Sequence, residues 1–357
     1  MSELWPFEDP TRRCLKVEDW PEADRLAWEA AMQPGDIIDG TVGPGHHWSD
    51  QTREKYRKGY GRWLTFLIGS GRFDGTVAPE ARVTREAVGD YLAELDGQVT
   101  SWTRWGRLAE LLAAIKAMAP DEDWTWLRRI VRRLESNVQD SRNKLVRLRS
   151  PEEIATWAFN EMETARTDLS ARNALTTYRT ALMIALLAHC PIRLGNLAAI
   201  KVGRHLVTEQ DGFRLAFNRT ETKTRKPLTV PIPPMLVPHI VFYLDTVRPA
   251  LLQNDDTARL WITRYGLPMQ PKTIHVAITD ATRRAFGEPI NPHLFRDCAA
   301  TFVALDDPKH IGIAAPILGH TDARTTERHY IQANQVAAGR RLRSSVDELR
   351  RRLPPPR

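Results

Sequence analysis

His293-Leu294-Phe295-Arg296 is the part of the chain that indicates its fold and chemistry most directly. Its His and Arg stand three residues apart, so on a helix they share one face. Two further pieces follow along the chain, Leu318-Gly319-His320 and then Tyr330. Together these residues offer a cation, proton donors and one hydroxyl nucleophile, which are the groups that chemistry on a phosphodiester requires.

The bulk composition is that of an ordinary soluble protein. The chain has 357 residues, of which 42% are hydrophobic and 27% charged, and this length favours two domains. The longest apolar run, residues 181–190, is about half as long as a membrane span and is followed by Pro191. The acidic start lacks the basic end and apolar core of a signal peptide. We therefore expect a cytoplasmic protein with no membrane partner.

Neither a metal site nor a disulfide framework is indicated. The three cysteines, Cys14, Cys190 and Cys298, are odd in number and far apart, so reduced and mostly buried thiols are expected. No acidic cluster suited to two metal ions accompanies the histidines. We accordingly expect no metal and no cofactor.

The net charge of +7 is unevenly distributed. The first fifty residues hold 11 Asp and Glu against 4 Lys and Arg, a balance of −7, so the remainder carries +14. A basic body of this size favours a polyanion such as DNA or RNA as partner. On charge alone, a basic surface without a partner is the alternative.

The N-terminal half reads as an arm followed by a helical domain. Residues 1–45 are acidic and rich in proline, with one short helix near 22–32, which favours a packing arm or a protein contact over a DNA-binding module. Helical spacing of apolar residues then predicts a four-helix domain over residues 46–136. Its expected helices span 49–69, 84–95, 101–118 and 124–134.

Basic residues decorate two of these helices and continue beyond them. A solvated face is the usual explanation for one such helix, but the continuation favours a surface that tracks phosphates. The predicted DNA contacts are Lys55, Arg57, Lys58, Arg62, Arg128, Arg129, Arg132, Arg133, Lys144 and Arg147.

A polar linker over 137–150 leads to a second domain over 151–333 and a C-terminal helix and tail over 334–357. Ser150 and Pro151 have the residue types of a helix cap and first turn. Short strands are expected at 213–217 and 227–231, and helices near 151–163, 170–189, 234–247, 273–286, 292–305, 309–318, 323–332 and 334–351. The predicted fold class is mainly α with a small β-hairpin, in two domains.

The motif around His293 and Arg296, together with His320 and Tyr330, resembles that of the tyrosine recombinase, or phage integrase, family. Cys190-Pro191-Ile192-Arg193 stands where the family carries its first catalytic Arg, and Lys223 lies in a hairpin turn where the family places a Lys. His293 and Arg296 match its His-x-x-Arg box, and His320 and Tyr330 match its final segment. A lone His-x-x-Arg would be weak evidence, whereas six positions in order form a specific signal. The resemblance implies a helical core-binding domain and a mixed α+β catalytic domain.

Three departures from the family pattern are visible. Asn196 stands where an acidic residue is common, three positions after Arg193, and Asp297 follows the box where a His is frequent. Tyr330 lies ten residues after His320, whereas nine is commoner. His329 cannot replace a Tyr as nucleophile, so Tyr330 keeps that assignment.

The resemblance implies a role for each catalytic residue. Arg193 and Arg296 would hold the non-bridging phosphate oxygens, and His320 would donate a hydrogen bond to one of them. Tyr330 would attack the phosphorus, with His293 as base or proton shuttle. Lys223 would protonate the leaving 5′ oxygen, and Lys226 is its main rival. Taken singly, each residue has an ordinary explanation as a surface or packing residue, and only the constellation favours a site.

The implied function is site-specific recombination through a 3′-phosphotyrosyl intermediate and a Holliday junction. The implied partner is double-stranded DNA with inverted core half-sites, bound by a homotetramer in which the C-terminal helix docks in trans. A directionality factor or a DNA-bending protein is left open as a further partner. The alternatives are an enzyme like a type IB topoisomerase and a catalytically silent DNA-binding regulator of the same fold. An RNA-binding protein is not supported by the motifs.

Overall fold

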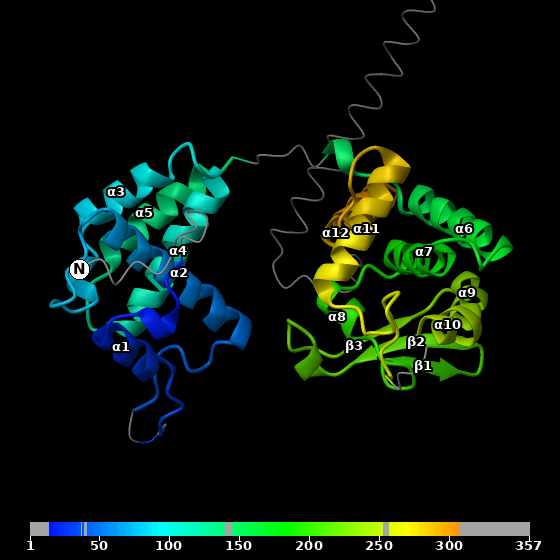
Figure 1. The fold of residues 1–357 in the computed structure, drawn as a ribbon, viewed down its shortest axis with the longest axis horizontal. Coiled ribbons are helices and arrows are strands. Elements are labelled where there is room, and N and C mark those ends of the chain that lie inside the picture. The colour runs from blue at the N-terminus through cyan, green and yellow to red at the C-terminus, as the bar shows by residue number, and fades with distance from the viewer. Residues whose placement is uncertain (1–13, 37, 39–40, 140–144, 253–256, 307–357) are drawn as a thin grey trace, which may run out of the picture. The chain divides into compact units, whose positions relative to one another are not determined.

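The computed structural model describes residues 14–36, 38, 41–139, 145–252 and 257–306 (Figure 1). The chain forms two compact units, Met1–Arg142 and Asn143–Arg357. The helices expected beyond residue 306, together with His320 and Tyr330, lie outside the described residues.

The first unit is entirely helical in its described part, and its helices confirm those predicted. Each of three helices begins at a hydroxyl residue whose side chain accepts a backbone N–H of the first turn, namely Ser49, Thr84 and Thr100. Tyr60 and Trp63 are fully buried in its core. The helices are α1 (Glu22–Met32), α2 (Asp50–Gly69), α3 (Arg85–Leu95), α4 (Ser101–Met118) and α5 (Thr125–Ser136).

The described part of the acidic N-terminal segment packs in the core of this unit. Trp20 and Trp28 are buried there, and Trp20 meets Tyr60 edge to face with ring centroids 5.1 Å apart. Asp24 is fully buried, where it pairs with Arg82 and accepts a hydrogen bond of 2.6 Å from the Tyr60 hydroxyl. A buried carboxylate needs such partners, so this network fixes α1 against α2.

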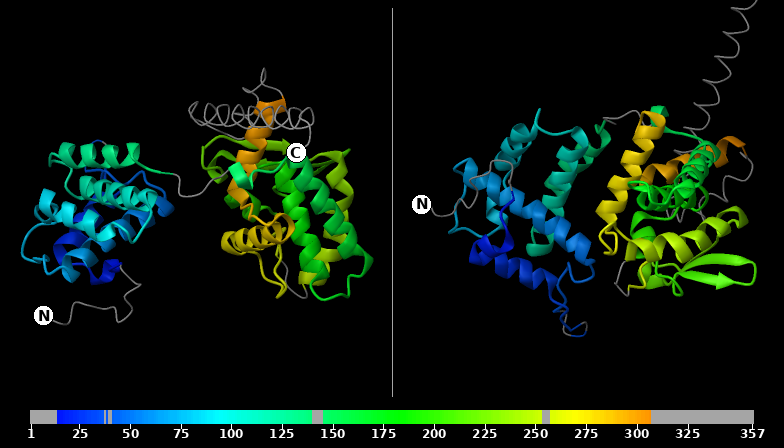
Figure 2. Two further views of the ribbon diagram at one scale, coloured as in Figure 1. Left: turned by 90° about the horizontal axis from the view of Figure 1, so that it is seen from above. Right: turned by 45° about the vertical axis from the view of Figure 1, so that its right-hand side comes forward.

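The second unit combines helices with a small antiparallel sheet (Figures 1 and 2). Ser150 caps its first helix and Pro151 takes the first position, as predicted. In Figure 1 the sheet lies below the helices α6, α7, α11 and α12. The elements are α6 (Pro151–Thr167), α7 (Ala174–His189), α8 (Leu194–Ala199), β1 (Leu206–Glu209), β2 (Gly212–Phe217), β3 (Leu228–Pro231), α9 (Val237–Phe242), α10 (Arg248–Leu252), α11 (Pro271–Phe286) and α12 (Pro292–Asp306).

Two details differ from the sequence prediction. The sheet has three strands in the order β1-β2-β3, because β1 also pairs with β2, placing Leu206 opposite Leu215. β1 has four residues, of which only Leu206 is buried, so it shows no alternation long enough to predict a strand. The helix expected from residue 170 begins at Ala174, since Asn173 before it has φ 73°.

Among the described residues, one helical run, Pro234–Leu252, is long and apolar enough to cross a membrane, with a mean hydropathy of 1.2. It comprises a 3-10 turn, α9, a π turn at Tyr243–Val247 and α10. Its buried residues recur at helical spacing and face the core of the second unit, which is the pattern of an amphipathic core helix. They are Leu236, Ile240, Tyr243, Val247 and Leu251.

Candidate active site

Arg193 stands at the start of α8, directly after the short non-helical segment that separates α7 from α8. α7 ends at His189, and Pro191 follows within two residues. Cys190 and Ile192 are buried on either side of the proline, which anchors the segment in the core. Arg193 is the N-cap of α8, and its carbonyl accepts the Leu197 N–H at 2.9 Å. These contacts fix the backbone position from which the Arg193 side chain extends.

His293 and Arg296 lie one turn apart on α12. Asn291 caps this helix, since its Oδ1 accepts the Leu294 N–H at 3.0 Å. Leu294 and Phe295 are buried between the two polar residues and hold the helix against the core. His293 is exposed, whereas Arg296 is 7% exposed.

A hydrogen bond joins α12 to the segment before Arg193. Nη1 of Arg296 donates to the Pro191 carbonyl at 2.6 Å, across 105 residues of sequence. The Pro191 carbonyl accepts no helical N–H because Pro191 lies between two helices. The bond holds Arg296 at the residue two positions before Arg193.

Lys223 projects from the connection between β2 and β3. The Thr222 hydroxyl donates to the Lys226 carbonyl at 2.6 Å and closes the turn, and Arg225 within it has φ 52°. Lys223 is exposed and Thr222 is buried. Lys226, the rival of Lys223, is also exposed but supplies its carbonyl to the closure.

The four described catalytic candidates lie close enough to affect each other electrostatically. Although His293 is exposed, neighbouring protein atoms partly desolvate its ring. This desolvation and then the positive charge of Arg296 lower the pKa of His293, with smaller contributions from Lys223 and Arg193, and Asp297 opposes them. Burial and then Arg193 lower the pKa of Arg296 to about 10, so it stays charged at neutral pH. The result is a neutral imidazole beside three cations, of which Arg296 is buried, and such an environment suits an anionic substrate.

Among the described residues, no group of three or more His, Cys, Asp or Glu side chains is placed to hold a metal ion. His320, Tyr330 and the predicted DNA contact Lys144 lie outside the described residues. The described candidate residues are two arginines, one lysine and one histidine, Arg193, Arg296, Lys223 and His293.

The predicted DNA contacts on α2 are engaged with neighbouring side chains. Arg57 and Lys58 both pair with Glu54, the latter at 3.0 Å, and Arg62 pairs with Glu110 at 2.9 Å. Lys55 is exposed, with its ammonium 5.8 Å from the centre of the Tyr56 ring. The two pairs with Glu54 lie at the surface and are worth little energy, so a phosphate can exchange for that carboxylate, whereas the Arg62 pair is partly buried.

The basic residues of α5 are more open. Leu127 and Val131 are buried on one side of the helix, while Arg129, Arg132 and Arg133 are exposed and Arg128 is half-buried. The remaining candidate differs, because Arg147 donates from Nε to the Pro289 carbonyl at 2.8 Å in the second unit. That bond ties the segment before α6 to the one before α12.

Sequence reasoning missed Glu221, which lies two residues before Lys223. Its carboxylate accepts the Asn218 N–H at 3.0 Å while the Asn218 side chain accepts a backbone N–H in return, forming a capping box. The Asn-x-x-Glu spacing was the available signal, but it stands in a polar stretch expected to be an irregular turn.

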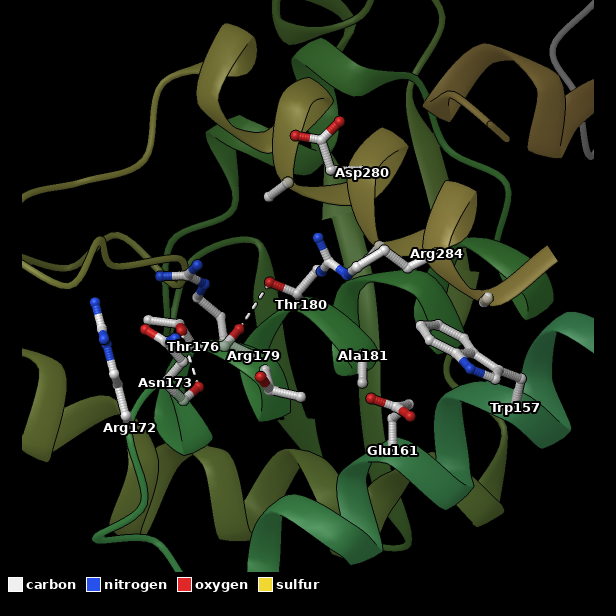
Figure 3. Close-up of a pocket in the computed structure, with 14 residues that line it drawn as sticks. Trp157, Glu161, Arg172, Asn173, Thr176, Arg179, Thr180, Ala181, Asp280 and Arg284 are labelled. Atoms are coloured by element: carbon white, nitrogen blue, oxygen red, sulfur yellow. Dashed lines mark hydrogen bonds between the residues drawn. The ribbon is translucent and has the colours of Figure 1, made fainter. Parts of the chain in front are cut away.

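The second unit also contains a cavity of about 760 Å³ that none of the four described catalytic candidates lines (Figure 3). It lies among α6, α7 and α11, with Trp157, Arg172, Arg179 and Arg284 in its wall. Arg179 is buried and donates to the Ile262 carbonyl, which holds the loop after α10. Within the described part of the chain, the cavity and the candidate active site share no side chain.

Residues 160–336 match the phage integrase family. Among curated proteins, the tyrosine recombinase XerD of Staphylococcus aureus is 25% identical over 166 residues, which are 46% of this chain and 54% of that protein. XerD of Staphylococcus saprophyticus is 25% identical over 161 residues, 44% of this chain and 52% of that protein. The chain thus spans about half the length of the curated relatives it matches.

Solved structures show the same fold. XerH site-specific recombinase, bound to palindromic difH substrate in a post-cleavage complex, has a TM-score of 0.55 at 11% identity, over 89% of this chain and 95% of that chain. The Tn1549 transposon integrase, in complex with transposon right end DNA, has a TM-score of 0.55 at 13% identity, over 89% and 98%. The expected fold class, mainly α with a small sheet, is confirmed. By the family match, residues 160–336, which make up most of the second unit, belong to the phage integrase family of tyrosine recombinases.

Proposed function

We propose that this protein is a site-specific DNA recombinase that cleaves and rejoins duplex DNA through a 3′-phosphotyrosyl intermediate, without a metal or nucleotide cofactor. The observation that carries the proposal is the meeting of Arg193, Lys223, His293 and Arg296 from three separate segments of one unit. Family membership and the resemblance of the motifs supply the two residues outside the described part, His320 and Tyr330.

Each step of cleavage has a group suited to it. Arg193, Arg296 and His320 bind the non-bridging oxygens, where charge accumulates in the transition state. The Tyr330 oxygen forms a bond to phosphorus and gives its proton to His293 as the bond from phosphorus to the 5′ oxygen breaks. Lys223 gives a proton to that 5′ oxygen. The phosphotyrosyl bond conserves the energy of the phosphodiester, so rejoining is the reverse attack by a 5′ hydroxyl.

The domain assignments enter the proposal as expectations about DNA. Residues 46–136 would contact the duplex as a core-binding domain, joined by the linker 137–150 to the catalytic domain over 151–333. Two protomers would bind inverted half-sites, and two such dimers would form a tetramer and exchange strands through a Holliday junction. The C-terminal helix over 334–357 would dock on a neighbouring protomer.

The test is covalent capture on a library of nicked duplexes with randomised core sequence. A nick beside the cleaved position makes the fragment that carries the 5′ hydroxyl short enough to diffuse away. Rejoining then fails and the protein–DNA adduct accumulates. Sequencing the captured DNA would reveal a core with inverted half-sites and thereby the target. A protein that binds DNA but forms no adduct with any library member would instead be the catalytically silent regulator.

The type IB topoisomerase alternative gives a different result. Such an enzyme would relax supercoiled plasmid that lacks any captured core, and its adducts would show no inverted repeat. A recombinase would require two cores and would yield products with exchanged flanks.

The pH dependence of cleavage is expected to reflect His293. Partial desolvation and the neighbouring cations favour the neutral ring and lower its pKa below the ordinary value of 6.5. A lowered pKa means that the base form persists to lower pH, so adduct formation should stay level at neutral pH and fall only below 6.5. Single-turnover rates across this range test the sign, and His293→Gln should abolish the acid limb. A midpoint above 6.5 would contradict the assignment.

A further inference from the structure

A hydrogen-bond network lies beneath the turn that carries Lys223. Glu221 accepts at Oε1 from His205 Nε2 at 3.1 Å and from Arg204 at 2.5 Å. Its other oxygen, Oε2, accepts the Asn218 N–H at 3.0 Å. The residue two positions before Lys223 is therefore held by three donors from two segments.

The protonation states of this network follow from its geometry. His205 is 4% exposed, and its Nδ1 accepts the Lys201 N–H at 3.0 Å, so Nε2 carries the proton that faces Glu221. The His205 ring stacks on Phe217 of β2 at 5.0 Å. The Asn218 N–H and then His205 lower the pKa of Glu221. Glu221 is thus ionised at neutral pH and accepts from every donor aimed at it.

One further bond connects this network to α8. Asn196 is 4% exposed, and its Nδ2 donates to the Glu221 carbonyl at 3.0 Å. It lies one turn after Arg193, the residue at which α8 begins. A single amide therefore links the helix that positions Arg193 to the turn that carries Lys223.

The polarity of this bond accounts for the amide at position 196. The partner is a carbonyl oxygen, which can only accept, so the side chain must donate. The acidic residue common in the family at this position would set a carboxylate against that carbonyl. The Asn196 amide therefore matches its partner in this chain, whereas an ionised acid would not.

We propose that Asn196 and Glu221 are positioning residues that set the distance between the phosphate-binding Arg193 and the proton donor Lys223. This inference rests on the proposed recombinase chemistry. In cleavage, the bond from phosphorus to the 5′ oxygen breaks while the bond to the Tyr330 oxygen forms, and the proton on Nζ of Lys223 passes to the 5′ oxygen. The link places Nζ for that transfer and touches no reacting atom itself.

The test compares two nicked substrates that differ in one atom. In the first, oxygen bridges phosphorus and the 5′ carbon. In the second, sulfur takes its place and leaves as a thiolate without needing a proton. Asn196→Asp is expected to slow cleavage of the oxygen substrate by about 100-fold, since small misplacements of catalytic groups cost that much. Asn196→Asp should cleave the sulfur substrate within about threefold of the wild-type rate, because general acid catalysis is bypassed. Lys223→Ala should do the same on that substrate.

Two further variants sharpen the comparison. Adding Asn196→Asp to Lys223→Ala should not slow cleavage of the oxygen substrate any further, because the two changes remove the same function. Asn160→Asp makes the same chemical change at an exposed site on α6 and should cleave both substrates as wild type does. The ratio of the two rates comes from one preparation, so partial unfolding of a variant cancels.

The outcomes separate this inference from the proposed function. Equal slowing of both substrates by Asn196→Asp would assign the residue to Arg193 or to the fold, and wild-type rates on both would leave the link without a role. Either result overturns the inference while the wild-type adduct upholds the function. A wild-type protein that forms no adduct on either substrate would overturn both.

Discussion

Replacing Tyr330 with Phe is expected to abolish the covalent protein–DNA adduct while leaving DNA binding intact. The phenyl ring keeps the shape of the side chain but has no oxygen to bond phosphorus. Loss of a nucleophile costs on the order of 10⁶-fold in rate, which puts the adduct below detection. The measurement is a denaturing gel of the captured core substrate, with binding followed separately by mobility shift.

The other tyrosines support this assignment and supply a control. Tyr60, Tyr91, Tyr178 and Tyr243 are buried in the cores of the two units, and burial raises the pKa of each, that of Tyr91 to about 12. A buried and protonated phenol cannot reach a phosphate. Tyr265 is 66% exposed on the same unit as the candidate site, so Tyr265→Phe is the matched control and should form the adduct normally.

An adduct that persisted in Tyr330→Phe would contradict the assignment. Mapping the DNA-linked peptide by mass spectrometry would then identify the true nucleophile. The question is a real one for this chain, because Tyr330 lies one residue further from His320 than is common in the family. Ten residues leave room for one extra residue in the connection, and the proposed mechanism still requires the hydroxyl to meet the phosphate that Arg193 and Arg296 would hold.

Local signals in the sequence predicted most of the fold. Ser49 and Ser150 marked helix starts because capping depends only on the next three residues. The His293 and Arg296 spacing predicted a shared helical face for the same reason. β1 escaped prediction because a strand of four residues is specified by its partner, through the pairing of Leu206 with Leu215, and not by its own pattern.

The contacts that complete the candidate site could not be predicted, because they join distant segments. Nothing near Arg296 in sequence indicates that it bonds the Pro191 carbonyl, since that depends on how α12 packs beside the break after α7. The same holds for Asn196, which appeared as a departure from the family pattern. Only the fold shows that its partner is a carbonyl of the Lys223 turn.

Arg296→Lys is expected to lower the rate of adduct formation by about 10²- to 10³-fold, the usual cost of losing one preorganised donor to a transition-state oxygen. A guanidinium carries five N–H donors in a planar fork, so one can bond the Pro191 carbonyl while the group also serves a phosphate. An ammonium is a compact charge on a flexible stem and cannot span both. The substitution therefore keeps a cation but loses the geometry.

The charge itself is also weakened in R296K. Burial and Arg193 lower the pKa of the native guanidinium to about 10, which still leaves it charged. An ammonium starts from a lower ordinary pKa, so the same surroundings would bring its titration closer to neutrality. The variant should regain part of its activity as the pH is lowered towards neutral through the range below about 10, in which the native guanidinium stays charged. Single-turnover cleavage across alkaline pH measures this.

Arg284→Lys provides the comparison for that experiment, because Arg284 is exposed on α11 and lines only the separate cavity (Figure 3). It should cleave at the wild-type rate at every pH. If Arg296→Lys did the same, the fork geometry would be irrelevant to catalysis. The Pro191 bond would then be a feature of the fold, and the phosphate would depend on Arg193 and His320 alone.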